Sequence, residues 1–311
     1  MAILLASRFG AHDLAVWRDA LQGVLPEETL LTEPVAGRAH EIDIALAANP
    51  PAGALRGLPA LRLVQSLWAG VEGLLADRSL PADVPLARMV DPAMNAAMAE
   101  TAAWAVLSLH RGFFDYAAQQ REARWQTHRQ RRADEVCVGV LGLGEMGRTV
   151  ALRLVRDGYR VMGWSTRAAP VAGVHTGAGE AALNALLSAA EIVINLLPLT
   201  PATRGFFDAR RLAQLRPGAA LVNLARGAHV VDEALLAALD AGQIGHAVLD
   251  AFEHEPLPAA HPYWSHPKVT LLPHVAAQTD PRSAAQVVAG NVRALRAGRP
   301  LAHLVDRSRG Y

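Results

Sequence analysis

The sequence predicts an α/β protein with two domains, each built around a parallel sheet. Its 311 residues are long for a single core and comfortable for two of ordinary size. Short apolar runs alternate with helix-sized segments, which is typical of parallel α/β domains. The alternation occurs in two separate series, one before Asn95 and one beginning at Val136, with a helical stretch between them.

The first series contains four apolar runs that we expect to be buried strands. Turn signals such as Asn49-Pro50-Pro51 and Arg56-Gly57-Leu58-Pro59 separate them from the segments around them. The apolar start of the chain is short, lacks a basic region and runs into Arg8, so we expect a strand there and not a signal peptide. The four expected strands are Ile3–Ser7, Ile42–Ala48, Leu61–Leu67 and Leu86–Val90.

The stretch from Asn95 to Arg124 connects the two series. It lacks proline and has few turn signals, which predicts one long helix with a bend at Arg111-Gly112. We place the domain boundaries near residues 97 and 283. Residues 1–97 and 284–311 then form one domain and residues 98–283 the other, with the chain end returning to the first domain.

The second series supplies six strand-like runs, most of them separated by helix-sized segments. Asp232–Ala241 is one such helix, closed by Gly242. The last segment, Pro281–Gly298, is expected to be a helix with Asp280 as its N-cap. The six expected strands are Val136–Leu141, Arg160–Trp164, Glu191–Leu197, Ala219–Ala225, Ala247–Phe252 and Val269–Leu272.

Composition excludes several classes of function. The formal net charge of +1 does not point to nucleic acid or a membrane surface as partner. No apolar run reaches the roughly 18 residues that a membrane helix needs. The single cysteine, Cys137, rules out an internal disulfide and fits a reducing compartment, so we expect a cytoplasmic protein. No His, Cys, Asp or Glu cluster has metal-ligand spacing, so we expect no metal.

A glycine-rich loop follows the first strand of the second series. Gly142 would make the tight turn, Gly144 would let the backbone approach a pyrophosphate, and Gly147 would permit close packing of helix on sheet. The helix that follows, Arg148–Asp157, offers the N–H groups of its first turn to the phosphates. The pattern predicts a dinucleotide site formed by Gly142, Leu143, Gly144, Glu145, Met146 and Gly147.

The end of the next strand indicates which dinucleotide binds. An NAD site places a carboxylate there for the ribose 2′-hydroxyl, whereas this sequence reads Trp164-Ser165-Thr166-Arg167 and has no acid before Glu180. Hydroxyls and a guanidinium would bind a 2′-phosphate, which a carboxylate would repel. We therefore expect NADP(H) to be preferred and NAD(H) to be possible.

Three segments at strand ends carry the residues for keto-acid reduction: Asn223–Gly227, Leu249–Pro258 and Leu272–Ala276. Ligands of open α/β sheets bind outside the carboxyl ends of the strands, so these segments should converge. They offer an Arg to grip a carboxylate, a His to move a proton and a Glu to hold the His. No Tyr-x-x-x-Lys is present, which argues against a short-chain dehydrogenase. The one lysine, Lys268, is not placed on a helix, which argues against a 3-hydroxyacid dehydrogenase.

With these motifs the chain resembles the D-isomer-specific 2-hydroxyacid dehydrogenases over nearly its whole length, and most closely their glyoxylate/hydroxypyruvate reductase branch. The resemblance implies a Rossmann-type domain, a smaller flavodoxin-like substrate domain built from both chain ends, and a homodimer. It assigns catalysis to Arg226, Glu255 and His274. Further similarity lies in Ser66–Glu72, Phe114-Asp115-Tyr116, Gln119-Gln120, Trp125-Gln126 and Val305–Tyr311.

The implied reaction is the NADPH-dependent reduction of a small 2-keto acid such as glyoxylate or hydroxypyruvate. Arg226 and the backbone N–H groups of Ala69, Gly70 and Val71 would bind the substrate carboxylate, and His274 would donate the proton. Trp68 is counted with Ala69 and Gly70 among the substrate-binding residues. Trp68 stands where relatives usually carry Gly, which puts the size of the acyl pocket in question. At the strand ends we expect the cofactor to contact Leu197, Pro198, Ala225, Asp250, His274 and Ala276.

Several alternatives remain open at this point. Glu253 competes with Glu255 as the partner of the histidine, and Asp250 could fix a loop instead of contacting the cofactor. His229 and His246 are expected to be ordinary loop or surface residues, as is His254. The rival functions are a reductase for a bulkier keto acid and a nucleotide-sensing binding protein that does not turn over substrate.

Overall fold

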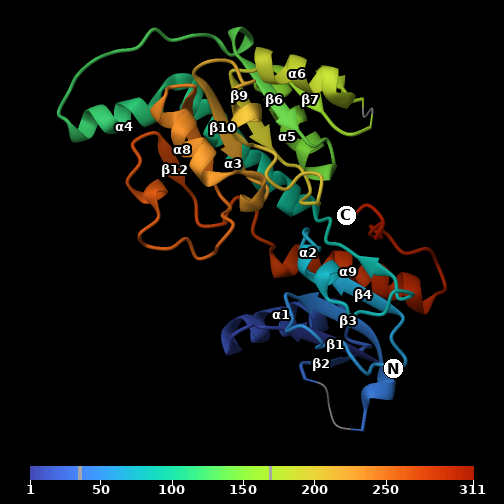
Figure 1. The fold of residues 1–311 in the computed structure, drawn as a ribbon. Helices are drawn as coiled ribbons and strands as arrows, with labels where there is room; N and C mark the ends of the chain where they lie inside the picture. Colours follow the sequence, from blue (N-terminus) through green and yellow to red (C-terminus); the bar gives the residue numbers. More distant parts are fainter. Residues whose placement is uncertain (34–36, 168–169) are drawn as a thin grey trace. The chain divides into compact units, whose positions relative to one another are not determined.

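The computed structural model describes residues 1–33, 37–167 and 170–311 (Figure 1). The chain divides into two compact units, one comprising Met1–Met94 with Thr279–Tyr311 and the other Asn95–Gln278. Each contains a parallel sheet with helices around it, so the predicted fold class is confirmed. The functional roles of the two units stay predictions.

The smaller unit is built on a five-stranded parallel sheet in the order β2-β1-β3-β4-β5. This is the flavodoxin-like strand order, with its switch point between β1 and β3. Helices α1 and α9 pack against each other (Figure 1). Leu55, Leu74 and their neighbours form a buried apolar cluster with side chains of β1, β3, β4 and β5. The elements are β1 (Ala2–Ser7), α1 (Ala11–Val24), β2 (Thr29–Leu31), η1 (Ala39–Glu41), β3 (Ile42–Ala48), β4 (Leu63–Ser66), α2 (Glu72–Ala76), β5 (Leu86–Ala87) and α9 (Pro281–Arg296).

Buried polar contacts hold the returning helix α9 to this sheet. The Arg296 guanidinium binds the Glu28 carboxylate at 2.7 and 2.8 Å and also contacts the fully buried Asp43. These carboxylates raise the pKa of Arg296. The Asn291 amide donates to Gln65 Oε1 at 2.7 Å. The C-terminal segment therefore belongs to the first domain through specific charge pairing as well as apolar packing.

The larger unit contains a seven-stranded parallel sheet in the order β12-β11-β10-β9-β6-β7-β8. Counted from β6, the first six strands of the doubly wound Rossmann order are present, with β12 added at one edge. The order in which successive strands are added to the sheet reverses between β6 and β9, and a dinucleotide binds at this point in such sheets. The strands are β6 (Cys137–Leu141), β7 (Arg160–Trp164), β8 (Val174–Gly177), β9 (Ile192–Asn195), β10 (Ala219–Asn223), β11 (Ile244–Leu249) and β12 (Val269–Leu271).

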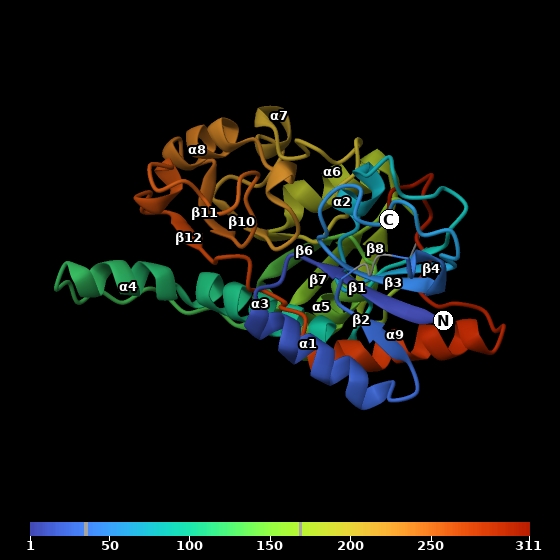
Figure 2. The ribbon, with the colours of Figure 1, turned by 90° about the horizontal axis from the view of Figure 1, so that it is seen from below.

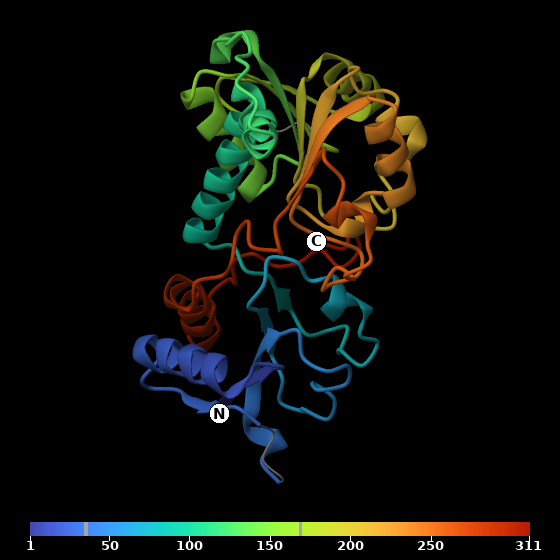
Figure 3. The same ribbon diagram turned by 90° about the vertical axis from the view of Figure 1, so that its left-hand side faces the viewer.

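Helices cover both faces of the larger sheet (Figure 3). On one face α3 and α5 bury Ala102, Leu154 and similar side chains against Val138 and Val140. On the other face the cores of α6, α7 and α8 pack against Val193 and the strands beside it. These helices and turns are α3 (Pro92–Arg111), α5 (Glu145–Arg156), α6 (Gly179–Ala189), α7 (Ala209–Leu212), η3 (Gly227–His229), α8 (Asp232–Asp240) and η4 (Pro262–Trp264).

The expected long helix over residues 95–124 is two helices. Helix α3 ends at Arg111, Gly112 takes a left-handed conformation with φ of 69°, and α4 (Phe113–Arg121) follows. The predicted bend is therefore a break, because a residue at positive φ interrupts the helical hydrogen bonds. Figure 2 shows α4 leading away from the sheet of the larger unit.

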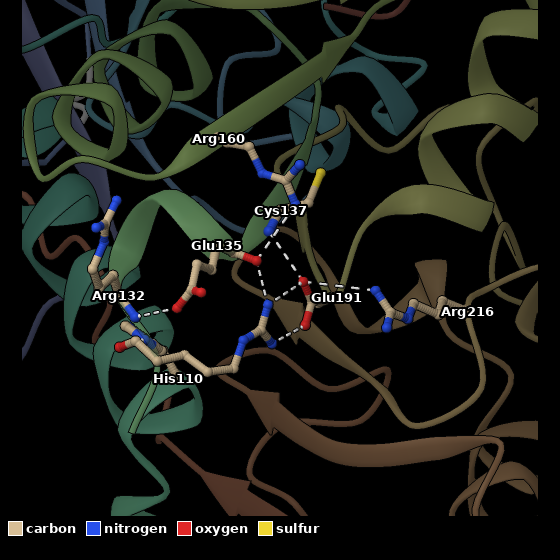
Figure 4. A network of polar contacts seen from close by, with 8 residues as sticks. His110, Arg132, Glu135, Cys137, Arg160, Glu191 and Arg216 are labelled. Atoms are coloured by element: carbon tan, nitrogen blue, oxygen red, sulfur yellow. Dashed lines mark hydrogen bonds and ion pairs between the residues drawn. The ribbon is translucent and has the colours of Figure 1, made fainter. Parts of the chain in front are cut away.

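We call residues 113–132 the arm, since the chain runs out along α4 and returns as an extended segment to η2 (Ala133–Glu135). The arm is held together by its own polar contacts: the Tyr116 hydroxyl accepts the His128 N–H at 2.9 Å, and Gln119 Oε1 accepts the Gln126 N–H at 3.1 Å. Trp125 near its tip is 97% exposed. At its base, Arg131 pairs with Glu191, which lies at the centre of the network in Figure 4 and also lies 3.7 Å from Arg216.

Two further differences from the sequence prediction have physical causes. The strand expected over Leu86–Val90 ends at Ala87, because the next N–H groups donate to His303 and Trp68 carbonyls instead of continuing the ladder. The short edge strands β2 and β8 were not expected. Edge strands are brief and partly exposed, so they lack a strong apolar run. Within the described residues, no helix is long and apolar enough to cross a membrane.

Candidate active site

The predicted catalytic and cofactor segments of the larger unit follow the carboxyl ends of its strands. The glycine loop follows β6, Leu197-Pro198 follows β9, and Arg226 follows β10. Asp250 and His274 come directly after β11 and soon after β12. Since all seven strands are parallel, these segments lie along one edge of the sheet, around the switch point between β6 and β9.

The glycine loop has the geometry that a pyrophosphate needs. Gly142 has φ of 92°, and a Cβ at Gly147 would lie 1.7 Å from the Gly142 carbonyl oxygen, so neither position accepts a side chain. At Gly144, by contrast, a Cβ would meet no heavy atom of the described chain within 4 Å, apart from its own neighbours. The backbone at Gly144 is therefore open to a ligand, directly before the N-terminus of α5 at Glu145.

The end of β7 presents hydroxyl and guanidinium groups. Trp164 is anchored, with Nε1 donating to the Gly179 carbonyl at 2.9 Å, whereas Thr166 and Arg167 are exposed. The Ser165 hydroxyl donates to the Arg167 carbonyl and so shapes the turn. This arrangement has no carboxylate at the strand end, and the exposed Arg167 is available to an anionic group.

Two buried asparagines shape the loops that follow β9 and β10. The Asn195 amide donates to Asn223 Oδ1 at 2.9 Å, and the same oxygen accepts the Ala225 N–H at 3.3 Å. The Asn223 amide donates to the Arg226 carbonyl at 3.0 Å. A Cβ at Gly227 would lie 1.9 Å from the Phe252 carbonyl carbon, so this loop passes close to the one that follows β11. The backbone of Arg226 is thus held by side chains that never reach the surface.

His274 and Glu255 are brought together from two different loops. Nδ1 of His274 lies 2.8 Å from Glu255 Oε2, and Oε1 of Glu255 accepts the Phe252 N–H at 2.9 Å. His274 has φ of 55°, a left-handed conformation that is uncommon for a residue other than glycine. Because Nδ1 faces the carboxylate, the Nε2 side of the ring is the one left to address a substrate.

Asp250 holds the chain that carries His274. Its carboxylate accepts the Val275 N–H at 2.7 Å and the Ala276 N–H at 3.1 Å, and its carbonyl accepts the His274 N–H. Burial raises the pKa of this carboxyl, which is 2% exposed. The loop-fixing interpretation therefore has direct geometric support, and the expected contact to the cofactor stays a prediction.

The remaining histidines and acids occupy other surroundings. Glu253 pairs with Arg204 at 2.8 Å, and both side chains are about half exposed, so it is Glu255 that lies on His274. His246 is on β11, away from the loops at the carboxyl ends, and its ring stacks on Phe114 at 4.5 Å. His229, expected in an ordinary loop or at the surface, is instead fully buried.

The expected substrate loop, Trp68–Gly70, lies in the other compact unit. The Trp68 indole packs edge-on against Trp17 at 6.0 Å and against Phe9 at 6.1 Å. Its Nε1 is buried and has no hydrogen-bond partner in the described part of the chain. The ring thus belongs to an aromatic cluster within its own unit. Among the described residues, no group of three or more His, Cys, Asp or Glu side chains is arranged to hold a metal ion.

Comparison with known proteins adds the family context. A family model described as "D-isomer specific 2-hydroxyacid dehydrogenase, NAD binding domain" matches residues 103–276. A curated relative from Yersinia enterocolitica named "Glyoxylate/hydroxypyruvate reductase A" is 39% identical over 300 residues, covering 95% of this chain and 96% of that protein. A protein of the same name from Serratia proteamaculans is 42% identical over 88% of this chain and 90% of its own length.

Two solved structures are similar over the whole chain. A D-isomer specific 2-hydroxyacid dehydrogenase from Xanthobacter autotrophicus, solved in complex with NADPH and MES, has a TM-score of 0.95 and 41% identity, covering 100% of this chain and 99% of that one. An NADPH-dependent glyoxylate/hydroxypyruvate reductase from Sinorhizobium meliloti, solved with NADP and sulfate, has a TM-score of 0.92 and 33% identity at the same coverage.

Proposed function

The chain belongs to the D-isomer-specific 2-hydroxyacid dehydrogenase family, and from that premise we propose that it reduces a small 2-keto acid with NADPH. Glyoxylate and hydroxypyruvate are the proposed substrates, since the curated relatives are named for them. The single observation that carries the proposal is the His274–Glu255 pair at 2.8 Å, which lies in the loops after β12 and β11, at the same edge of the sheet as the glycine loop. A binding protein without turnover would have no need of an oriented acid there.

The nicotinamide, when bound, supplies the hydride for the keto carbon, and the residues of this chain supply binding and the proton. Arg226 binds the substrate carboxylate, because a guanidinium presents two parallel N–H donors to two oxygens. His274 donates the Nε2 proton to the carbonyl oxygen, which becomes the hydroxyl. Glu255 holds the imidazole through Nδ1 and so keeps the proton on the side of the substrate.

The cofactor fits the residues of the larger unit. The open backbone at Gly144 and the first turn of α5 would hold the pyrophosphate, and Ser165, Thr166 and Arg167 would hold the 2′-phosphate. NADPH preference is supported by the NADPH and NADP in the two similar structures. NADH remains a possible second cofactor, because the adenosine and pyrophosphate portions are common to both.

The test is the loss of NADPH absorbance with a panel of 2-keto acids of increasing size. We expect turnover with glyoxylate and hydroxypyruvate, and slower turnover with bulkier acids. Turnover of only bulky acids would favour the reductase for larger substrates. Saturable binding of NADPH without turnover of any keto acid would favour the nucleotide-sensing protein.

We also propose that the chain acts as a cytoplasmic homodimer. The arm supports the dimer: it carries Trp125, which is 97% exposed, and Phe113, which is 47% exposed, and Trp104 on the neighbouring helix α3 is 41% exposed. Exposed aromatic side chains on a protruding element are typical of interfaces. Light scattering should give twice the chain mass of 33.1 kDa, and Trp125→Ala should weaken the dimer. A wild-type protein of single-chain mass at micromolar concentration would contradict this part of the proposal.

A further inference from the structure

His229 connects the two loops on which the proposed function depends. It lies in η3, three residues after Arg226, and is 0% exposed. Its Nδ1 is 3.1 Å from the Arg226 carbonyl oxygen, and its Nε2 is 3.3 Å from the Pro198 carbonyl oxygen. One imidazole thus faces the backbone of the proposed carboxylate-binding residue on one side and the backbone of the loop after β9 on the other.

The surrounding backbone joins the same two loops. The Gly205 N–H donates to the Ala228 carbonyl and the Phe207 N–H to the His229 carbonyl, both at 2.8 Å. The Pro198 carbonyl also accepts the Thr203 hydroxyl at 2.7 Å. The loop after β9 and the loop after β10 are therefore hydrogen-bonded to each other, and the His229 ring lies between them.

A buried imidazole at this position needs hydrogen-bond partners. Each ring nitrogen faces a carbonyl oxygen, which only accepts hydrogen bonds: a neutral imidazole has one N–H and can donate to one of the two, and only the imidazolium can donate to both. A buried polar ring without partners is costly. An aliphatic side chain of similar size would fill the space without needing any partner. The ring is well suited, however, to fixing the distance between two carbonyl groups, because it presents a nitrogen to each.

We propose that His229 is a positioning residue that sets the backbone of Arg226 relative to the loop at Pro198. The Nδ1 side governs how Arg226 meets the substrate carboxylate. The Nε2 side sets the position of the loop after β9, which is expected to contact the cofactor. The inference rests on the proposed function for the identity of the two ligands, and it adds a residue that couples their two sites.

The two sides of the ring can be separated by substitution. In His229→Asn the amide nitrogen can take the place of Nδ1, and in His229→Gln it can take the place of Nε2. His229→Leu removes both. The binding of NADPH is measured by its fluorescence, and the binding of oxalate, a carboxylate ligand with no reducible carbonyl, is measured at saturating NADPH. KM and kcat for glyoxylate are measured beside them.

We expect a crossed pattern. Each amide keeps a nitrogen toward one carbonyl and removes the nitrogen that faces the other. His229→Gln should therefore raise the dissociation constant of oxalate and the KM of glyoxylate about threefold to tenfold, the range expected for one hydrogen bond, and leave NADPH binding within twofold. His229→Asn should weaken NADPH binding by a similar factor and leave oxalate binding within twofold. His229→Leu should show both losses. A purely structural histidine would not separate the two ligands.

The matched control is His246→Leu, which removes a half-buried imidazole of the same unit, one that lies 2.9 Å from the Thr270 hydroxyl. It should lower stability and leave both dissociation constants unchanged. Equal shifts of both ligands in the Asn and Gln variants, or no shift in either, would overturn the positioning role. If His229→Leu does not fold, the comparison of oxalate and NADPH binding in His229→Asn and His229→Gln still tests the positioning role. Wild-type protein that binds NADPH and oxalate but reduces no keto acid would refute the proposed function alone.

Discussion

Oε2 of Glu255 lies 2.8 Å from Nδ1 of His274, while the other carboxylate oxygen accepts the Phe252 N–H at 2.9 Å. The carboxylate is therefore fixed by its own loop before it meets the imidazole. His274 in turn is held by Asp250, whose carbonyl accepts the His274 N–H at 2.9 Å. Two acids from one segment thus set the position of the histidine, one through the ring and one through the backbone.

Glu255→Gln should reduce kcat for keto-acid reduction by about a hundredfold or more, because the amide no longer holds the imidazole as a carboxylate does. The matched control is Glu253→Gln. Glu253 pairs with Arg204 in an exposed ion pair, so its loss should change kcat by less than about threefold. Steady-state kinetics on glyoxylate compares the two. Equal losses in both variants would show that the 2.8 Å contact is not the one that matters.

Arg226→Lys should lose most of its activity despite keeping the charge. Lysine offers a point charge where a planar fork is needed to grip two carboxylate oxygens. A charged hydrogen bond is worth about 1.5–3 kcal/mol, so kcat/KM should fall roughly tenfold to a hundredfold, mainly through KM. A variant with nearly normal kinetics on glyoxylate would remove Arg226 from carboxylate binding.

Cofactor preference should follow the side chains after β7. Wild-type protein should use NADPH with at least about tenfold higher kcat/KM than NADH, mostly through a lower KM, because Arg167 pairs with the 2′-phosphate. Ser165→Asp with Arg167→Ala should reverse the preference, since the new carboxylate repels the phosphate and accepts from a free 2′-hydroxyl. Arg210→Ala, in helix α7, serves as the charge-matched control. Equal efficiencies with both cofactors in the wild type would contradict the role of Arg167.

Stability should fall as the pH is lowered from about 6.5 to about 4, in part because of His246. Burial is the main cause that lowers the pKa of this imidazole from 6.5 to about 4, partly opposed by Asp115. The unfolded chain then binds a proton that the folded chain does not, so the free energy of unfolding decreases across this window, by at most about 3 kcal/mol. Urea unfolding at several pH values measures it. The slope should be smaller in His246→Gln, and an unchanged slope would mean that other groups account for it.

Trp68→Gly should destabilise the smaller unit by about 3–5 kcal/mol, since the indole packs edge-on against the stacked rings of Phe9 and Trp17. Trp68→Phe should retain much of that packing. Chemical unfolding of both variants measures the difference. The ranking of keto acids by size, taken on the same variants, addresses the acyl pocket. A ranking shifted toward larger acids in Trp68→Gly would indicate that the indole also limits substrate size, and an unchanged ranking would leave it a core residue.

Much of the fold and the chemistry could be predicted from sequence because the signals are local. The strand before Gly142, the three glycines and the start of α5 follow one another directly along the chain. Each glycine is expected there because the backbone at its position makes a tight turn, approaches a pyrophosphate or packs closely. The absence of an acid at Ser165 is a local observation of the same kind. Weak local signals were missed: β2 and β8 are short edge strands, and Gly112 gave a break where a bend was expected.

The sequence by itself determined the types of groups present: a phosphate loop, a hydroxyl and guanidinium strand end, and an Arg, a Glu and a His at successive strand ends. Only the tertiary structure decided their pairing. In the structure, Glu255 contacts His274, and Glu253 pairs with Arg204. The Asp250 carboxylate accepts the Val275 and Ala276 N–H groups, and the buried His229 ring lies between two carbonyl groups. The reason is that such contacts join loops that meet only because parallel strands end at one edge, and their distances depend on the packing beneath them.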